Sequence, residues 1–235
     1  MSRSVTFVTL LIRPTNGYRP LSAYLEHFSH LVATGLPIVA YVDESISLDP
    51  APNVTVVPLS RPTGRPEVQL PPGRTLPKDN EEYFWIQLEK LKCMVRAREI
   101  TQTPYLAWID FGAFHMFRDK PLATLALRRI ATRTYPTTTI FAPSCWGPGS
   151  YPLCDRVCWR FCGTFLLGHR DLFPAAYAKQ QELVDQHLPR LTWEVNYWCL
   201  MEEHFTLYSA DHNERLLTEL CHYVGPEAPG KLKTL

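Results

Sequence analysis

Residues 105–112 have the sequence Tyr-Leu-Ala-Trp-Ile-Asp-Phe-Gly, an apolar run that ends in the carboxylate of Asp110, with Gly112 two positions later. Pro104 precedes the run, whose length and bulk are typical of a strand buried on both faces. Gly112 permits the sharp exit that such a strand needs. Because ligands of open α/β sheets bind outside the carboxyl ends of the strands, we expect Asp110 to face a ligand. The alternative is an aspartate that stabilises a turn or caps the next segment.

The chain alternates between strand and helix patterns. We expect strands at residues 5–12, 38–42, 53–58, 105–109, 138–142, 160–167 and 205–209. We expect helices from residue 21 to a stop at Gly35, and at residues 81–100, 122–131, 172–188 and 193–203. Strand, helix, strand in succession indicates an α/β fold with a parallel sheet and helices packed on its faces. The proline-rich residues 59–78 predict a long ordered loop or a lid.

The composition is that of an ordinary globular protein. The 235 residues are 46% hydrophobic and 20% charged, which suits one domain with a substantial core. The net charge of +1 lacks the positive excess that phosphate-backbone binding usually requires. Three arginines at positions 128, 129 and 133 are more typical of a solvated helix face than of a nucleic-acid site.

No apolar run has the length of a membrane span. Residues 5–12 are far shorter than the roughly 20 residues that a spanning helix needs, and they lack the small-residue cleavage site of a secretion signal. We therefore expect a soluble cytoplasmic protein with no membrane span.

The seven cysteines are an odd number, which argues against a fully paired secreted framework. Cys154, Cys158 and Cys162 stand four residues apart and would share one face of a helix. A metal site would need a fourth ligand, for which Cys145 is the nearby thiol, and usually closer pairs of cysteines. Reduced, partly buried cysteines are the alternative that we favour.

Four features in chain order resemble a known family. They are a helix that carries Lys90, the strand ending Trp-Ile-Asp-Phe-Gly, a Gly-x-Phe-x-x-Gly block at residues 163–168, and an acidic helix start at Glu194. Over residues 80–215 the chain resembles the HtrL/YibB family of glycosyltransferase-like proteins, which are similar to nucleotide-sugar glycosyltransferases of the GT-A fold. The resemblance implies transfer of a sugar from a nucleotide-sugar donor, with a UDP-sugar favoured, to a hydroxyl acceptor.

The resemblance also implies an architecture. It is a Rossmann-type mixed, mostly parallel sheet with helices on both faces, in a single domain over residues 1–235. Residues 1–110 would form the nucleotide-binding half, and residues 111–235 the acceptor-side half. The acceptor could be a glycan, a protein side chain or a modified base in nucleic acid, each of which presents a hydroxyl group. The sequence gives no indication of the oligomeric state.

Site residues carry over from the family one by one. Asp110 matches the acid of the family's D-x-G block, and Lys90 matches the preceding helix lysine, with Lys92 as a close competitor. Gly163 opens the strand that floors the site, Glu194 is the acid that follows, and His212 stands where a late histidine ligand is expected. Gly112 replaces the second acid of the D-x-D motif, so this loop cannot bind a metal through two aspartates.

The chemistry of these residues suits a diphosphate leaving group. Mg2+ or Mn2+ held by Asp110 would neutralise it, and an imidazole ligand from His212 would favour Mn2+. Arg13, in the first loop, or Lys90 could supply positive charge at the phosphates without a metal. An exposed histidine without a metal is the alternative for His212.

Two further residues complete the predicted site. Glu194 could act as the general base in an inverting reaction or stabilise the sugar cation in a retaining one. Its alternative role is that of a helix-start acid favoured by the macrodipole. Trp193 and other aromatic residues could stack on a base or sugar, although most large aromatics belong to the core. The missing second aspartate leaves open a non-catalytic nucleotide- or sugar-binding module.

Overall fold

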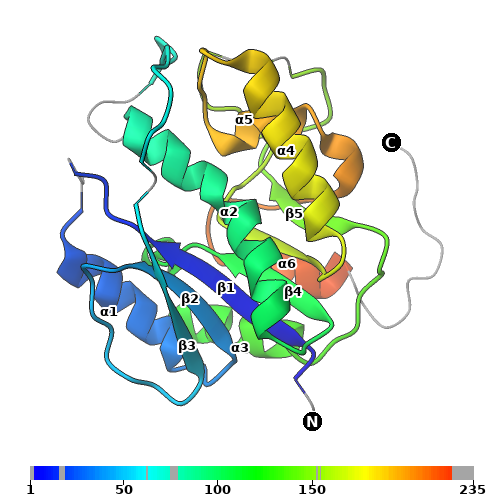
Figure 1. Cartoon of the computed structure of the whole chain (residues 1–235). Helices are drawn as coiled ribbons and strands as arrows, with labels where there is room; N and C mark the ends of the chain where they lie inside the picture. The colour runs from blue at the N-terminus through cyan, green and yellow to red at the C-terminus, as the bar shows by residue number, and fades with distance from the viewer. Residues whose placement is uncertain are drawn as a thin grey trace.

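The computed structural model describes residues 3–15, 19–61, 63–74, 79–151, 153 and 155–223 of the chain. Within these residues, seven strands form one sheet covered by helices on both faces (Figure 1). The strands are β1 (Val5–Leu11), β2 (Ile38–Asp43), β3 (Val54–Leu59), β4 (Tyr105–Ile109), β5 (Ile140–Ser144), β6 (Phe165–His169) and β7 (Phe205–Ser209). The helices are α1 (Leu21–Val32), α2 (Glu81–Ile100), α3 (Lys120–Ile130), α4 (Phe173–His187), α5 (Glu194–Cys199) and α6 (Arg215–Tyr223). Short 3-10 turns lie at Ala113–His115 and Glu202–His204.

The strand order β3-β2-β1-β4-β6-β5-β7 gives a mixed, mostly parallel sheet, which confirms the predicted fold class. Strand β1 is parallel to both β2 and β4, and β2 is parallel to β3. Strand β6 is antiparallel to β4 and β5, while β7 is parallel to β5. All strands except β6 therefore point the same way, so their carboxyl ends meet at one edge together with the start of β6. Ligands of such sheets bind outside this edge.

The two faces of the sheet bury separate apolar clusters. Neighbouring residues of β1 point to opposite faces, with Phe7 in one cluster and Val8 in the other. The Phe7 side packs against α1, α3 and α6, and the Val8 side against α2, α4 and α5. Strand β4 is buried throughout, as its apolar sequence predicts. Among the described residues, no helix is both long enough and apolar enough to cross a membrane.

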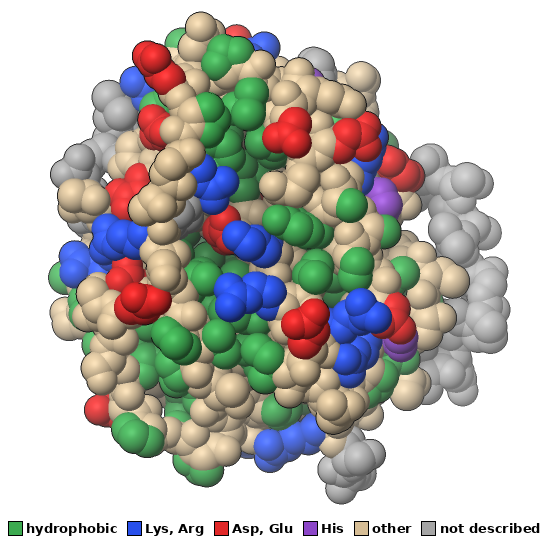
Figure 2. Space-filling view, viewed as in Figure 1, with side chains coloured by type: hydrophobic (Ala, Val, Ile, Leu, Met, Phe, Trp, Pro, Cys, Tyr) green, Lys and Arg blue, Asp and Glu red, His purple; other side chains and the backbone are tan. Residues whose placement is uncertain are grey.

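Helix α2 runs across the sheet and carries the predicted lysine into the interior. It begins where expected, because the side chain of Asn80 accepts a hydrogen bond of 2.9 Å from the backbone N–H of Tyr83. The face that α2 and α4 cover shows Lys and Arg side chains interspersed with Asp and Glu (Figure 2). No single charge dominates this face, in keeping with the net charge of +1.

The described part of the proline-rich loop after β3 is ordered along α2. Arg61 donates to Asp43 at 2.7 Å, and Arg65 donates to Glu89 at 2.8 Å while its guanidinium lies over the Trp85 ring. Gln69 forms an isolated parallel bridge with Arg190. These contacts support the expectation of an ordered loop for residues 59–61 and 63–74. Residues 62 and 75–78 of the predicted loop lie outside the described part of the chain.

Two predictions about the second half of the chain were wrong, and one helix was missed. The strand predicted at residues 160–167 begins only at Phe165, so Gly163 lies in the turn before β6. This turn is held by Cys162, whose N–H donates to Pro143 O at 2.8 Å. The helix predicted at residues 193–203 ends at Cys199 and is followed by the 3-10 turn at Glu202–His204. Helix α6, which buries an apolar face, was not predicted.

Candidate functional site

A cavity of about 620 Å³ opens at the carboxyl edge of the sheet, a size common for small-molecule sites. Several elements at this edge contribute to its lining. The residues used below are Arg19, Tyr83, Lys90, Asp110, Gly112, His115, Val157, Trp159, Gly163, Trp193, Glu194 and His212. They come from the loop after β1, from α2, from the end of β4, from the segment between β5 and β6, from α5 and the residue before it, and from the loop after β7. The cavity therefore lies where the sequence predicted a ligand.

Lys90 is the centre of the polar wall. Its Nζ donates to Glu194 Oε1 at 2.8 Å and to Gly163 O at 2.9 Å, and it lies 3.2 Å from Asp110 Oδ1. An ammonium group has three donors, so each N–H of Lys90 has an acceptor. The side chain is only 4% exposed. The structure thus brings together four predicted residues, Lys90, Asp110, Gly163 and Glu194, and shows that Lys90, rather than Lys92, belongs to the site.

The Lys90 ammonium keeps its charge despite this burial. Burial alone would lower the pKa of Lys90, but the negative charges of Asp110 and Glu194 and their hydrogen bonds raise it above the ordinary value. Lys92, by contrast, is 41% exposed and pairs with Glu89 on the outside of α2. A fixed positive charge therefore stabilises both carboxylates of the cavity wall.

The Asp110 carboxylate is held by Trp108 and Lys90 and is exposed to the cavity. Its Oδ1 accepts a hydrogen bond of 2.8 Å from Trp108 Nε1 and contacts Lys90. Its main-chain N–H donates to Thr164 O at 3.0 Å, which ties the end of β4 to the start of β6. The N–H of Ala113 bonds the main-chain oxygen of Asp110, not its carboxylate. The carboxylate, with 36% of its side chain exposed, therefore faces the cavity instead of capping the turn.

Glu194 approaches the site because residue 163 has no side chain. A Cβ atom at Gly163 would lie 2.5 Å from Glu194 Oε1 and 3.2 Å from Lys90 Nζ. With any residue other than glycine at this position, the Glu194 carboxylate would have to move and the Lys90 ammonium would have to shift slightly. The role of Gly163 is thus to let the carboxylate and the ammonium meet over the backbone, although it lies in a turn and not in the predicted strand.

We expect Gly163→Ala to disrupt the site. The added methyl group would push Glu194 away from Lys90, at a cost of about 1–3 kcal/mol in the free energy of unfolding, as for other overpacked positions. Chemical denaturation measures this loss. Gly147→Ala is the matched control, because a Cβ at Gly147 has no atom within 4 Å. Equal stability of the two variants would show that a side chain at residue 163 fits beside Glu194 without cost.

Two aromatic residues complete the wall beside these acids. Burial, Glu194, Asp110 and Asp79 together raise the pKa of Tyr83 well above its usual value, so its phenol is neutral and can donate a hydrogen bond. Trp193 lines the cavity but is 5% exposed and packs edge-on against Phe84. Most of the Trp193 ring therefore belongs to the core, as expected from the sequence for most large aromatic residues.

Of the two cations predicted to lie at the phosphates, Lys90 lines the cavity and Arg13 does not. Arg13 is not among the lining residues, and its Nε is buried without a hydrogen-bond partner in the described structure. Arg19 lines the cavity, with its Nη1 3.6 Å from where a Cβ of Gly112 would lie. His115 also lines it, and its Nδ1 lies 2.6 Å from Gly112 O. Neither residue was predicted from the sequence. The one signal for Arg19 was its closeness in the chain to the first loop, and the one signal for His115 was its closeness to the D-x-G block.

His212 lies in the loop after β7 and lines the cavity as predicted. Its ring packs edge-on to Trp159, with 5.0 Å between ring centroids. Among the described residues, no three or more His, Cys, Asp or Glu side chains are grouped to hold a metal ion. Cys154 of the predicted cysteine row lies outside the described residues, and Cys158 contacts Cys199 rather than Cys162. The described cysteines therefore form no metal centre.

Comparisons with known proteins show only distant similarity. No family model matches the chain, and no curated protein matches it. Among solved structures, the bifunctional IspDF of Campylobacter jejuni aligns with a TM-score of 0.43 and 8% identity, over 88% of this chain and 49% of that one. This chain thus spans about half the length of IspDF. A glycosyltransferase involved in glycosylation of the major capsid of PBCV-1 aligns with a TM-score of 0.46 and 11% identity, over 87% of this chain and 81% of that one.

Proposed function

We propose that the protein transfers a sugar from a nucleotide-sugar donor, with a UDP-sugar favoured, to a hydroxyl-bearing acceptor. The observation that carries this proposal is the Lys90 ammonium, which holds Asp110 and Glu194 at one wall of a cavity at the carboxyl edge of the sheet. The resemblance of residues 80–215 to the HtrL/YibB family supports the same class of reaction. A glycan, a protein side chain or a modified nucleic acid would each provide the acceptor hydroxyl.

The three groups have separate roles in this proposal. Lys90 uses its three donors on protein oxygens, so it positions the two acids instead of binding the donor. Arg19 supplies the positive charge for the diphosphate, a role that the sequence had suggested for Arg13 or Lys90. Glu194 takes the proton of the acceptor hydroxyl if the reaction inverts, or stabilises positive charge on the sugar ring if it retains.

Asp110 and His212 are the residues that would hold Mn2+ or Mg2+. Asp110 Oδ1 contacts Trp108 and Lys90. The protein ligands of the ion would therefore be Asp110 Oδ2 and the His212 imidazole. This set fits an ion that takes its remaining oxygen ligands from the diphosphate and water. The bound ion would neutralise negative charge on the leaving group.

Metal binding should therefore depend on the nucleotide. In calorimetric titrations, UDP and Mn2+ should each raise the affinity for the other by the same factor, about tenfold or more. His212→Ala should reduce this factor, whereas His222→Ala, an exposed histidine on α6, should leave it unchanged. Tight binding of Mn2+ without UDP, or UDP binding indifferent to Mn2+, would contradict the proposed ligand set.

The function itself is tested by release of UDP. We expect the protein to release UDP from one member of a panel of UDP-sugars when Mn2+ is present, slowly to water and faster when an acceptor is added. UDP binding without turnover of any donor would favour the rival function, a nucleotide- or sugar-binding module. The absence of a second aspartate at Gly112 is the observation that favours this rival.

A further inference from the structure

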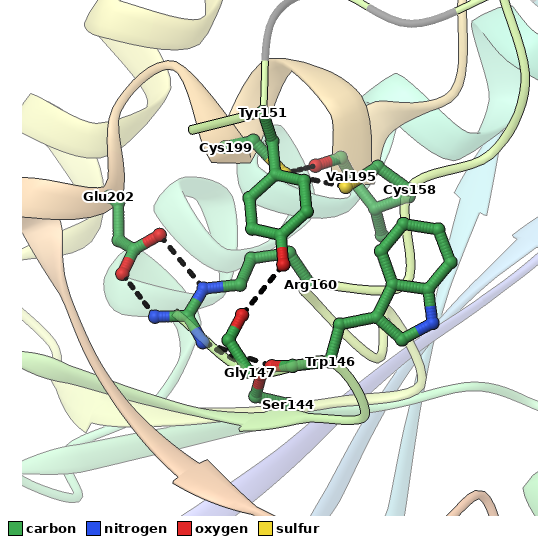
Figure 3. Close-up of polar contacts among 9 residues, drawn as sticks. All are labelled: Ser144, Trp146, Gly147, Tyr151, Cys158, Arg160, Val195, Cys199 and Glu202. Atoms are coloured by element: carbon green, nitrogen blue, oxygen red, sulfur yellow. Dashed lines mark hydrogen bonds and ion pairs between the residues drawn. The ribbon is translucent and has the colours of Figure 1, made fainter. Parts of the chain in front are cut away.

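Two thiols, those of Cys158 and Cys199, touch each other beside residues that line the cavity and outside the Lys90 site. Cys199 Sγ lies 3.5 Å from Cys158 Sγ and donates a hydrogen bond of 3.2 Å to Val195 O (Figure 3). Cys158 is buried, whereas Cys199 is partly exposed. The sulfur atoms of a disulfide are about 2.05 Å apart, so the two need to approach by only about 1.5 Å.

The backbone around the pair is already held in place. The N–H of Cys158 donates to Asn196 Oδ1 at 2.8 Å, and Asn196 Nδ2 donates to Arg156 O at 3.0 Å. On the other side of Cys158, Arg160 pairs with Glu202 and donates to Trp146 O at 3.0 Å (Figure 3). The approach of the two sulfurs therefore depends mainly on side-chain rotation.

The pair joins two parts of the cavity wall. Val157 and Trp159, the neighbours of Cys158, line the cavity. Cys199 is the last residue of α5, the helix that begins with Glu194. A bond between these sulfurs would cross-link positions 41 residues apart and fix one wall of the cavity to the other.

Two alternatives to a thiol pair fail on the described geometry. A zinc site needs about four ligands, and no group of three or more candidate ligands occurs among the described residues. Cys162 does not supply a third thiol to such a group, although it is the next cysteine after Cys158 in the chain. What remains is a pair of adjacent thiols, one accessible and one buried, which is the arrangement of an attacking and a resolving cysteine.

We propose that Cys158 and Cys199 form a site of reversible disulfide formation, with a small disulfide such as oxidised glutathione as the oxidant. The deprotonated sulfur of Cys199 attacks one sulfur of oxidised glutathione and releases one glutathione thiolate, which takes up a proton. The deprotonated sulfur of Cys158 then attacks the Cys199 sulfur and releases the second glutathione. Two protein thiols are oxidised by two electrons, and one oxidised glutathione becomes two reduced molecules. This inference does not depend on the proposed sugar transfer.

The full chain, treated with oxidised glutathione, tests the proposal. Free thiols are alkylated, and the digested protein is analysed by mass spectrometry before and after dithiothreitol. We expect a peptide cross-linked through Cys158 and Cys199 that dithiothreitol removes, and slower hydrogen exchange over residues 155–163 in the oxidised protein. Cys93 should stay reduced, because burial raises the pKa of its thiol.

Variants separate this pair from the other thiols. Cys199→Ser should abolish the cross-link, and Cys145→Ser, which removes an exposed thiol of a different pair, should retain it. Three results would overturn the proposal. They are glutathione bound stably to Cys199 while Cys158 stays free, a cross-link only between Cys145 and Cys162, or no reaction at Cys199 while the exposed Cys145 reacts.

Discussion

Asp110→Asn should lower the rate of sugar transfer by about 10²- to 10³-fold, the usual cost of losing one preorganised electrostatic group at a reacting centre. Asparagine keeps an oxygen that can accept from Trp108 Nε1, so β4 should end as before. It removes the negative charge beside Lys90 and the proposed metal ligand. Because the interaction with the leaving diphosphate is lost, both kcat and kcat/KM should fall, as measured by UDP release under saturating Mn2+.

Asp171→Asn provides the control for that experiment. Asp171 is 58% exposed and pairs with Arg98 on the surface, away from the residues that line the cavity. Its loss should leave the rate unchanged within error. Full activity of Asp110→Asn, with a circular dichroism spectrum like that of the wild type, would remove Asp110 from the mechanism.

Lys90→Met should destabilise the fold and abolish activity together. It removes the partner of a Glu194 side chain that is 6% exposed, and breaking a buried pair in this way costs about 3–5 kcal/mol. Urea unfolding measures the loss. Lys92→Met, at a side chain 41% exposed that pairs with Glu89, should change stability by less than about 1 kcal/mol.

A double variant distinguishes charge from packing in this result. Lys90→Met with Glu194→Gln leaves no buried carboxylate unpaired, since the remaining acid, Asp110, is 36% exposed, so it should recover much of the stability that Lys90→Met loses. It should recover no activity, since both the ammonium and the acid are absent. Equal instability of the single and double variants would show that the lysine contributes through packing alone.

The raised pKa of Lys90 also sets the pH range in which the ion pairs of Lys90 stop stabilising the fold. Below the unfolded value of about 10.5, the ammonium is charged in both states and its contribution is fully present. As the pH rises through the higher folded value, the contribution disappears. The difference in unfolding free energy between the wild type and Lys90→Met should therefore be constant near neutral pH. It should shrink only above about pH 10.5, where the unfolded lysine loses its proton.

The sequence revealed the parts of the site that local patterns encode. The apolar run before Asp110 and the Gly112 turn predicted a strand end, and the helical pattern of residues 81–100 predicted the element that carries Lys90. The rule that ligands bind at the carboxyl edge then placed the acid correctly at a cavity. These features depend on residues close together in the chain.

Contacts between distant residues were beyond such patterns. Lys90 meets Glu194 across 104 positions, and this pairing requires β6 to insert antiparallel between β4 and β5. Strand patterns give no pairing partner or direction, so Gly163 was placed in a strand instead of in the turn before β6. Arg19 was missed for a similar reason, because an arginine after a loop has no periodicity that marks it as facing a cavity.

A structure determined with UDP and Mn2+ bound tests the central claim most directly. The account predicts density for the diphosphate in the cavity beside Arg19 and Asp110, with Lys90 still bound to Glu194 and Gly163. Binding of the nucleotide at the smaller hollow lined by Arg65, Glu81, Glu82 and Trp85, with the cavity at the carboxyl edge left unchanged, would contradict it.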